Sequence, residues 1–448
     1  MLIAYRILLP CTSVKVALFA ALSAAWFSST AAAEESLSIA VLPVASSEAG
    51  PAAPQTDAPS LRCEPAGDMP LPLAAVAFSF DGKTLAVGGL GEVVLWDLAE
   101  GKLARRIEFG QPGTMVQAVA SAGYGRTLVA GQGSPFAWGA VTLLDLQTGK
   151  TLVEFREPKG PVNCLALSTD GRRLVAGCGD GAAYVYALDE KKLVATLKDH
   201  ALPVLSASFS FDGKFLVTGG ADAKLQTWDT VEWKPDVPTT VGGEVRHAEI
   251  RRSQIPKEGA ALHTFAMIVG GREDRSLRVM LDGKAQIWQR KSDYHVVVQP
   301  GVPLDCAWLA KGGPKAYVAC TDATIKVFVE GDRRFTHTAT LRGHSDWVYD
   351  LALSRDGARL VSASADGTVK LWSTADEKLL ATIVHLAPKT DRWLIVARDG
   401  WFAASAPETV RWKMANLSAT PEKLAALQNP EAVRQALAGE PPAAPTLP

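Results

Sequence analysis

The chain has 448 residues, 48% of them hydrophobic, which is longer than an ordinary single domain. Its 46 Lys and Arg residues balance 47 Asp and Glu residues, so the formal net charge is -1. Without a positive excess there is no general attraction to phosphate groups, which argues against nucleic acid and anionic membranes as ligands.

The first 33 residues have the features of an export signal. Arg6 and Lys15 precede an apolar run over residues 16–27, and small residues such as Ala33 suit cleavage by a signal peptidase. The alternative is a membrane anchor, but this run is shorter than the about 20 residues of a spanning helix. We therefore expect a mature chain that begins near Glu34, is not inserted in a membrane, and is periplasmic or secreted.

A change of composition separates the next segment from the rest of the chain. Residues 34–58 are rich in Ala, Pro and Ser, and such a segment cannot bury enough apolar surface to offset its ordering entropy. We expect a flexible leader here. From residue 59 onward, short apolar runs alternate with turn residues, which is typical of an all-β fold.

Two sequence markers recur along residues 72–384. The first is a Ser-x-Asp-Gly tetrapeptide between two apolar runs, where Asp-Gly favours a tight hairpin; it begins at Ser79, Ser168, Ser210 and Ser354. The second is an aromatic residue six positions after an Asp, found at Asp180/Tyr186, Asp222/Trp228, Asp282/Trp288, Asp322/Phe328 and Asp366/Trp372. Trp96 and Leu144 take the aromatic place in the first two units. The markers recur at about 40 to 48 residues, with one longer interval, which is the period of a four-stranded blade.

These markers resemble those of the WD-repeat (WD40-type) β-propeller family, whose signature dipeptide stands here as Trp96-Asp97 and Trp228-Asp229. The resemblance implies an all-β propeller with seven full blades. After them, residues 392–397, the turn Arg398-Asp399-Gly400 and residues 401–405 repeat the strand, turn, strand pattern. With residues 410–412 and 60–63, they predict a composite eighth blade from the two chain ends, over residues 59–415 in all. The alternative is seven blades with an appended hairpin.

Residues 416–448 are expected to form a short helical tail with a Pro-rich end. Asn429 and Pro430 have the character of an N-cap and first helical residue, and Gly439 stands where that helix would end. Residues 399–412 and 429–440 also resemble an element found after propellers in exported bacterial proteins that carry c-type cytochrome or caspase-like domains. The sequence has no C-x-x-C-H motif for attaching haem.

Two units contain the four residues that form a hydrogen-bonded tetrad in WD repeats, at identical spacing. The two sets are His200, Thr218, Asp222 and Trp228, and His344, Ser362, Asp366 and Trp372. The resemblance implies that each set satisfies buried polar groups between blades. A Ser/His/Asp catalytic set is the alternative, but recurrence with the blade favours a structural role. No histidine has metal-ligand spacing, so we expect no metal and no cofactor.

The cysteines form two pairs of equal spacing. Cys164 and Cys178 flank the turn of one unit, and Cys306 and Cys320 flank the equivalent turn of another. In an antiparallel hairpin these positions are expected to face one another, so in an oxidising compartment they are candidate disulfides. The alternative is that they are small apolar strand residues.

Three aromatic residues are candidates for binding a partner. Trp347 is expected near the channel rim, and an insertion in the second unit carries Phe136 and Trp138 on the same face. The sequence therefore predicts a non-catalytic exported scaffold for an unidentified protein partner. The alternatives are a propeller enzyme, such as a lactonase-like hydrolase or cofactor-dependent dehydrogenase, and an accessory protein that docks a c-type cytochrome.

Overall fold

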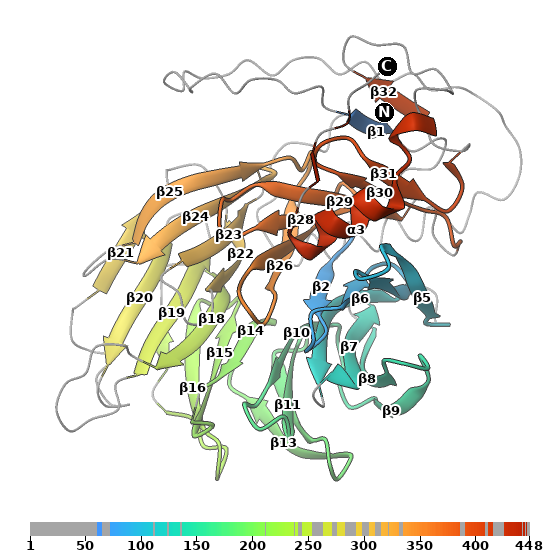
Figure 1. Cartoon of the computed structure of the whole chain (residues 1–448). Helices are drawn as coiled ribbons and strands as arrows, with labels where there is room; N and C mark the ends of the chain where they lie inside the picture. Colours follow the sequence, from blue (N-terminus) through green and yellow to red (C-terminus); the bar gives the residue numbers. More distant parts are fainter. Residues whose placement is uncertain are drawn as a thin grey trace, which may run out of the picture.

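The computed structural model describes residues 61–64 and 72–445, apart from short gaps of which the longest are 253–262, 283–292, 298–303 and 415–424. The expected signal peptide and leader, residues 1–58, lie outside the described residues. Within the described part the chain is almost entirely β-strand (Figure 1).

The strands form successive antiparallel sheets. The first strands of these sheets are β2 (Ala75–Phe78), β6 (Met115–Ala122), β10 (Val162–Leu167), β14 (Val204–Phe209), β18 (Glu244–Arg252), β22 (Leu304–Leu309) and β26 (Val348–Leu353). The second strands are β3 (Thr84–Gly88), β7 (Thr127–Ser134), β11 (Arg173–Cys178), β15 (Phe215–Gly220), β19 (His263–Gly270), β23 (Lys315–Cys320) and β27 (Arg359–Ser364).

The outer half of each sheet follows the same order. The third strands are β4 (Glu92–Asp97), β8 (Trp138–Asp145), β12 (Ala182–Ala187), β16 (Lys224–Asp229), β20 (Ser276–Asp282), β24 (Thr324–Glu330) and β28 (Thr368–Ser373). The fourth strands are β5 (Lys102–Glu108), β9 (Thr151–Phe155), β13 (Lys192–Lys198), β17 (Thr239–Thr240), β21 (Asp293–Val297), β25 (Phe335–Arg342) and β29 (Leu379–His385). Each first strand contacts the first strands of both neighbouring sheets, and β26 contacts β2, so the sheets close into a ring.

The expected number of blades is wrong. The described strands form six four-stranded blades, from β2–β5 to β22–β25, and the ring is completed by a single six-stranded sheet, β26–β31. The segment expected to begin an eighth blade instead extends this last sheet, because β30 (Trp393–Ala397) pairs along the outer edge of β29, and β31 (Phe402–Ala404) pairs with β30. Seven full blades followed by a composite eighth are therefore not formed.

Contacts at the ring closure leave no room for a further blade. The Leu73 N–H donates to the Ser364 carbonyl at 3.2 Å, and the Val76 N–H donates to the Asp350 carboxylate at 2.8 Å. These bonds join the first blade directly to the six-stranded sheet. The chain ends pair separately, as a two-stranded sheet of β1 (Leu61–Glu64) and β32 (Arg411–Met414), away from that junction (Figure 1). We call the junction of the first blade with the six-stranded sheet the seam.

The recurring sequence markers have clear structural roles. In each Ser-x-Asp-Gly turn the Ser hydroxyl bonds to the Asp carboxylate at 2.5 to 2.7 Å, and the Gly has φ near 70°, which suits a residue without a Cβ. The residues at the aromatic place that the structure describes are all buried: Trp96, Leu144, Tyr186, Trp228, Phe328 and Trp372. The markers are therefore the turns and the core of the repeated sheet.

A β-bulge recurs in the first strand of the sheets, and the sequence gives no sign of it. The pairing of first and second strands shifts by one residue at Val116/Ala118, Val162/Cys164, Val204/Ser206, Val245/His247, Leu304/Cys306 and Val348/Asp350. A bulge bends the strand and redirects the side chains that follow it. Two of those side chains reach the next sheet, since Ser206 donates to the Val245 carbonyl and Asp350 accepts from Val76.

One helix, α3 (Pro430–Ala438), packs against β29, β30 and β31 near the seam (Figure 1). Its ends lie where the capping residues predict: the Asn429 side chain accepts from the Ala432 N–H, and Gly439 ends the helix with φ of 95°. Val433, Ala436 and Leu437 are buried in one core cluster with residues of both the first blade and the six-stranded sheet.

Candidate functional site

The structure brings the four side chains of the first tetrad together. Trp228 donates from Nε1 to the Thr218 hydroxyl at 2.9 Å, and that hydroxyl lies 2.9 Å from Nε2 of His200. Nδ1 of His200 is in turn 2.9 Å from the Asp222 carboxylate. A carboxylate can only accept, so Nδ1 of His200 carries the hydrogen that faces Asp222; in the neutral ring Nε2 then accepts from the Thr218 hydroxyl.

The second tetrad repeats this geometry in the six-stranded sheet. Trp372 donates to the Ser362 hydroxyl at 2.9 Å, and the hydroxyl lies 2.7 Å from Nε2 of His344, whose Nδ1 is 2.9 Å from Asp366. Burial lowers the pKa of His344, so its ring is neutral at neutral pH. Burial disfavours the charge of Asp366, but hydrogen bonds from His344, Thr368 and the Ser345 N–H together outweigh it and hold the pKa of that carboxyl well below its usual value.

Burial separates the tetrads from any substrate. The His200 and His344 side chains are each 1% exposed, and those of Asp222 and Asp366 are 6% and 7% exposed. Each tetrad hydroxyl is already bound to a Trp and a His. A nucleophile must reach its substrate, so these sets lack the access that a catalytic triad requires.

The tetrads instead hold loops in place. The Asp222 carboxylate accepts from the Ala201 N–H at 2.9 Å, and Asp366 accepts from the Ser345 N–H at 2.9 Å. Each bond ties the connection that enters a sheet to the turn between its second and third strands. We call the side of the ring formed by these connections and turns the tetrad face.

Trp347 lies on the tetrad face, directly before β26. Its side chain is half-buried and meets the Tyr349 ring edge-on, with the ring centroids 6.4 Å apart. Its backbone is fixed, since the Trp347 carbonyl accepts from the Ala365 N–H at 2.8 Å. The position of this aromatic residue is therefore set by the sheet that carries it.

Trp138 lies on the same face of the second blade. It begins β8 opposite Ser134, the last residue of β7, and its side chain is half-buried. The insertion seen in the sequence is thus a lengthening of this hairpin, with eight residues in each strand. Phe136, the other aromatic candidate of this turn, lies outside the described residues.

The expectation that the cysteines of each pair face one another is wrong. The bulge in the first strand moves the pairing by one residue, so the partners are Val162 with Cys178, Cys164 with Gly177, Leu304 with Cys320, and Cys306 with Ala319. Cys164 and Cys178 are free thiols. Burial raises the pKa of the Cys178 thiol well above its ordinary value, which leaves this thiol unreactive.

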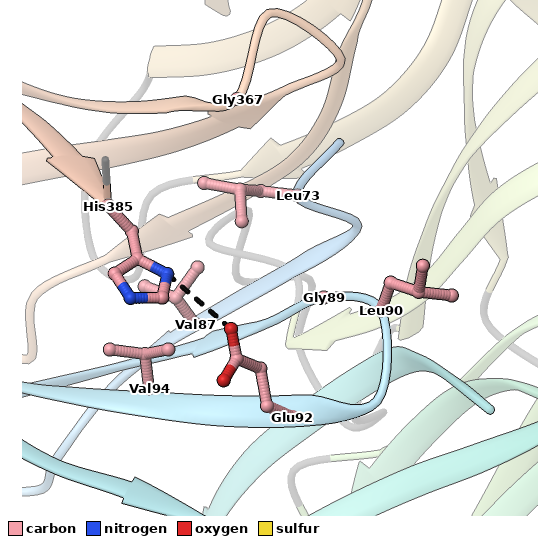
Figure 2. A pocket seen from close by; sticks show the side chains of 8 residues that line it. All are labelled: Leu73, Val87, Gly89, Leu90, Glu92, Val94, Gly367 and His385. Carbon is pink, nitrogen blue, oxygen red and sulfur yellow. Dashed lines mark ion pairs between the residues drawn. The ribbon is translucent and has the colours of Figure 1, made fainter. Parts of the chain in front are cut away.

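A cluster that sequence reasoning missed lies at the seam (Figure 2). Glu92 in β4 is bound by Arg106 of β5. It also pairs with His385 at the end of β29, beside a small crevice whose apolar lining includes Leu73 and Val94 (Figure 2). No spacing rule connects these residues, because His385 belongs to a different sheet from Glu92 and Arg106, and the cluster has no counterpart in the tetrads.

Neither a metal centre nor a membrane span is found in the part of the chain that the structure describes. No three His, Cys, Asp or Glu side chains there gather closely enough to hold a metal ion. No helix within those same ranges is long and apolar enough to cross a membrane.

Comparison with known proteins agrees with the repeat and the fold. Residues 149–186, 191–229 and 335–373 match the family described as WD domain, G-beta repeat, and the last two stretches contain the tetrads. WD repeat-containing protein 18 of Bos taurus is 24% identical over 327 residues, which cover 69% of this chain and 71% of that protein. Protein ROOT INITIATION DEFECTIVE 3 of Arabidopsis thaliana is 23% identical over 234 residues, 51% of this chain and 52% of that protein.

A solved structure shows the same fold. A chain in the crystal structure of the mitotic checkpoint complex matches with a TM-score of 0.57 at 20% identity, over 72% of this chain and 98% of that chain. At this identity the likeness concerns the fold alone. This chain therefore carries WD40 repeats on an all-β propeller.

Proposed function

We propose that this protein is a non-catalytic scaffold that is exported and binds a protein partner on the tetrad face. The observation that carries the proposal is the pair of buried tetrads, whose carboxylates tie the loops of this face to the sheets. Loops fixed in this way lose little conformational entropy when a partner binds, which favours affinity.

The tetrad face offers apolar contacts for such a partner. Trp138 and Trp347 are half-buried there, and Leu202, in the connection that enters β14, is 50% exposed. Aromatic residues held in a rigid setting are typical anchors of protein interfaces. The exposed residues Ser345 and Asp346 stand beside Trp347 and supply the polar rim that surrounds such anchors.

The named relatives support a binding role over a reaction. One is described as a WD repeat-containing protein, and the solved structure with this fold is of a complex. The two Ser/Thr, His and Asp sets of this chain are buried and mutually bonded, so they serve the scaffold. A cytochrome remains one identity for the partner, and the experiment below identifies it.

The test compares retained partners for matched variants. The mature chain from Glu34 is immobilised and exposed to an extract of the compartment in which it is found, as wild type and as the double variant Trp138→Ala, Trp347→Ala. The control is Phe80→Ala, Val231→Ala, which removes exposed apolar side chains of 39% and 80% exposure from the opposite side of the ring.

We expect the wild type and the control to retain one and the same partner protein. The tetrad-face variant should retain at least tenfold less of it, although its own thermal unfolding is unchanged. Loss in the control alone, or equal retention by all three proteins, contradicts the assignment of the binding face. Turnover of a substrate by the purified chain contradicts the non-catalytic role.

Export has its own test. The apolar run at residues 16–27 and the small residues before Glu34 support it. We expect protein recovered outside the cytoplasm to begin at or near Glu34. An intact amino terminus on protein that stays in the cytoplasm would contradict export.

A further inference from the structure

The seam contains a buried cluster of charged groups (Figure 2). Glu92 holds Arg106 through one carboxylate oxygen, with Nε at 2.9 Å, and its other oxygen lies 3.4 Å from Nδ1 of His385. The side chains of Glu92, His385 and Arg106 are 6%, 9% and 11% exposed. His385 belongs to the six-stranded sheet and Glu92 to the first blade, so this pair crosses the ring closure.

The two acceptors that face the His385 ring indicate which of its nitrogens carry hydrogens. Nε2 lies 2.8 Å from the Thr390 carbonyl, which can only accept, so Nε2 carries a hydrogen. A neutral imidazole has one such hydrogen, and its Nδ1 would then direct a lone pair at the Glu92 carboxylate. Only the doubly protonated ring donates in both directions.

We propose that the seam is a proton-dependent clasp, in which doubly protonated His385 joins β29 to Glu92 of the first blade. When the ring loses its Nδ1 proton, the attraction across the seam is replaced by repulsion between a lone pair and a carboxylate. The ring closure therefore weakens when His385 loses this proton.

Other charged groups surround the Glu92–His385 pair. Apart from His385, Arg106 is the one cationic side chain that contacts Glu92 in the described structure. It is shared with Glu108 of β5 at 2.5 Å and with Asp391, after β29, at 3.6 Å. The latter two carboxylates are 53% and 84% exposed and are screened by water, but both reduce the positive charge that Arg106 offers to Glu92. The rest of the crevice is lined by apolar side chains and Gly.

A second titratable group at the seam acts in the same direction. Asp350 accepts from the Val76 N–H across the closure, and burial raises the pKa of this carboxyl to about 7. Its folded pKa thus lies above the unfolded value of about 3.9, so the folded state binds the extra proton. The contribution of Asp350 to stability is complete at low pH and is lost as pH rises through about 7.

Nuclear magnetic resonance of the full chain with 15N-labelled histidine tests the clasp directly. At about pH 6 we expect both ring nitrogens of His385 to carry protons, with the signal assigned by its loss in His385→Gln. In Glu92→Gln, which keeps the shape and removes the charge, Nδ1 is expected to be unprotonated at that pH. An unprotonated Nδ1 in the wild type overturns the proposal.

Thermal unfolding gives a second measurement. We expect the midpoint of the wild type to fall by several degrees between about pH 6 and about pH 8, and His385→Gln to show a smaller fall. The matched control is His337→Gln, which removes an exposed histidine remote from Glu92 and should keep the wild-type fall. An equal fall in wild type and His385→Gln overturns the clasp; if that variant does not fold, the Glu92→Gln comparison decides.

Discussion

Ser362 and Thr218 hold the same place in the two tetrads, each as the hydroxyl between a Trp ring and a His ring. Both hydroxyl residues are fully buried. Removal of one hydroxyl leaves a buried N–H donor and a buried ring nitrogen without partners, which costs more than the lost bonds alone. The tetrads therefore stabilise the sheets that carry the tetrad face.

Ser362→Ala is expected to lower the free energy of unfolding by about 1 to 3 kcal/mol, measured by urea denaturation. Ser362→Thr should retain most of the stability, because Thr218 makes the same bonds in another blade. The control is Ser345→Ala, since Ser345 is exposed and contributes its backbone N–H to Asp366. If Ser362→Ala had the same free energy of unfolding as the wild type, this role would be contradicted.

The role of a residue could be predicted from the sequence where the same residue pattern occurs in a second repeat. The tetrads could be located because two sets share one spacing. Glu92 and His385 could not, since they come from different sheets and meet only after the ring has closed. Asp350 was missed because a bulge, which leaves no mark in the sequence, turns its side chain toward the next sheet.

Helix α3 stabilises the seam by contacting both of the sheets that meet there. Leu437 packs among side chains of the first blade and the six-stranded sheet, and its carbonyl accepts from Arg359 at 3.0 Å. Arg359 also donates to the Gly82 carbonyl in the first blade at 3.1 Å. Gly101, in the turn after β4, lies so close to α3 that an added Cβ would be 3.3 Å from Arg434.

Leu437→Ala should lower the free energy of unfolding by about 2 to 4 kcal/mol, because it opens a cavity where three parts of the fold meet. Gln435→Ala, at an exposed position of the same helix, is the control and should change stability little. Chemical denaturation measures both. Equal stability of the two variants would show that α3 is not part of the closure.

The limits of prediction differ for helix and strand. The caps of α3 are local, so Asn429 and Gly439 mark it in the sequence. The strands β30 and β31 were also anticipated, but their alternating pattern is the same whether they start a blade or extend one. Pairing with β29 rather than with the chain ends depends on the ring already being closed between β2 and β26.

At the scale of the molecule, six four-stranded blades and one six-stranded sheet form a closed ring with a fixed tetrad face. The repeat made the all-β propeller predictable, whereas the number of blades depends on long-range pairing of the chain ends. A partner bound to a face of this ring meets loops from several sheets at once. That geometry is the basis of the proposed scaffold function.

The most direct test of partner binding by the tetrad face is photo-cross-linking in the living cell. A photoreactive amino acid is placed in turn at positions 138, 347, 80 and 231. We expect the proteins that carry it at positions 138 and 347 to cross-link to the same partner, and those that carry it at positions 80 and 231 not to do so. Cross-links to that partner only from positions 80 or 231, or no protein cross-linked from positions 138 and 347, would contradict a partner-binding tetrad face.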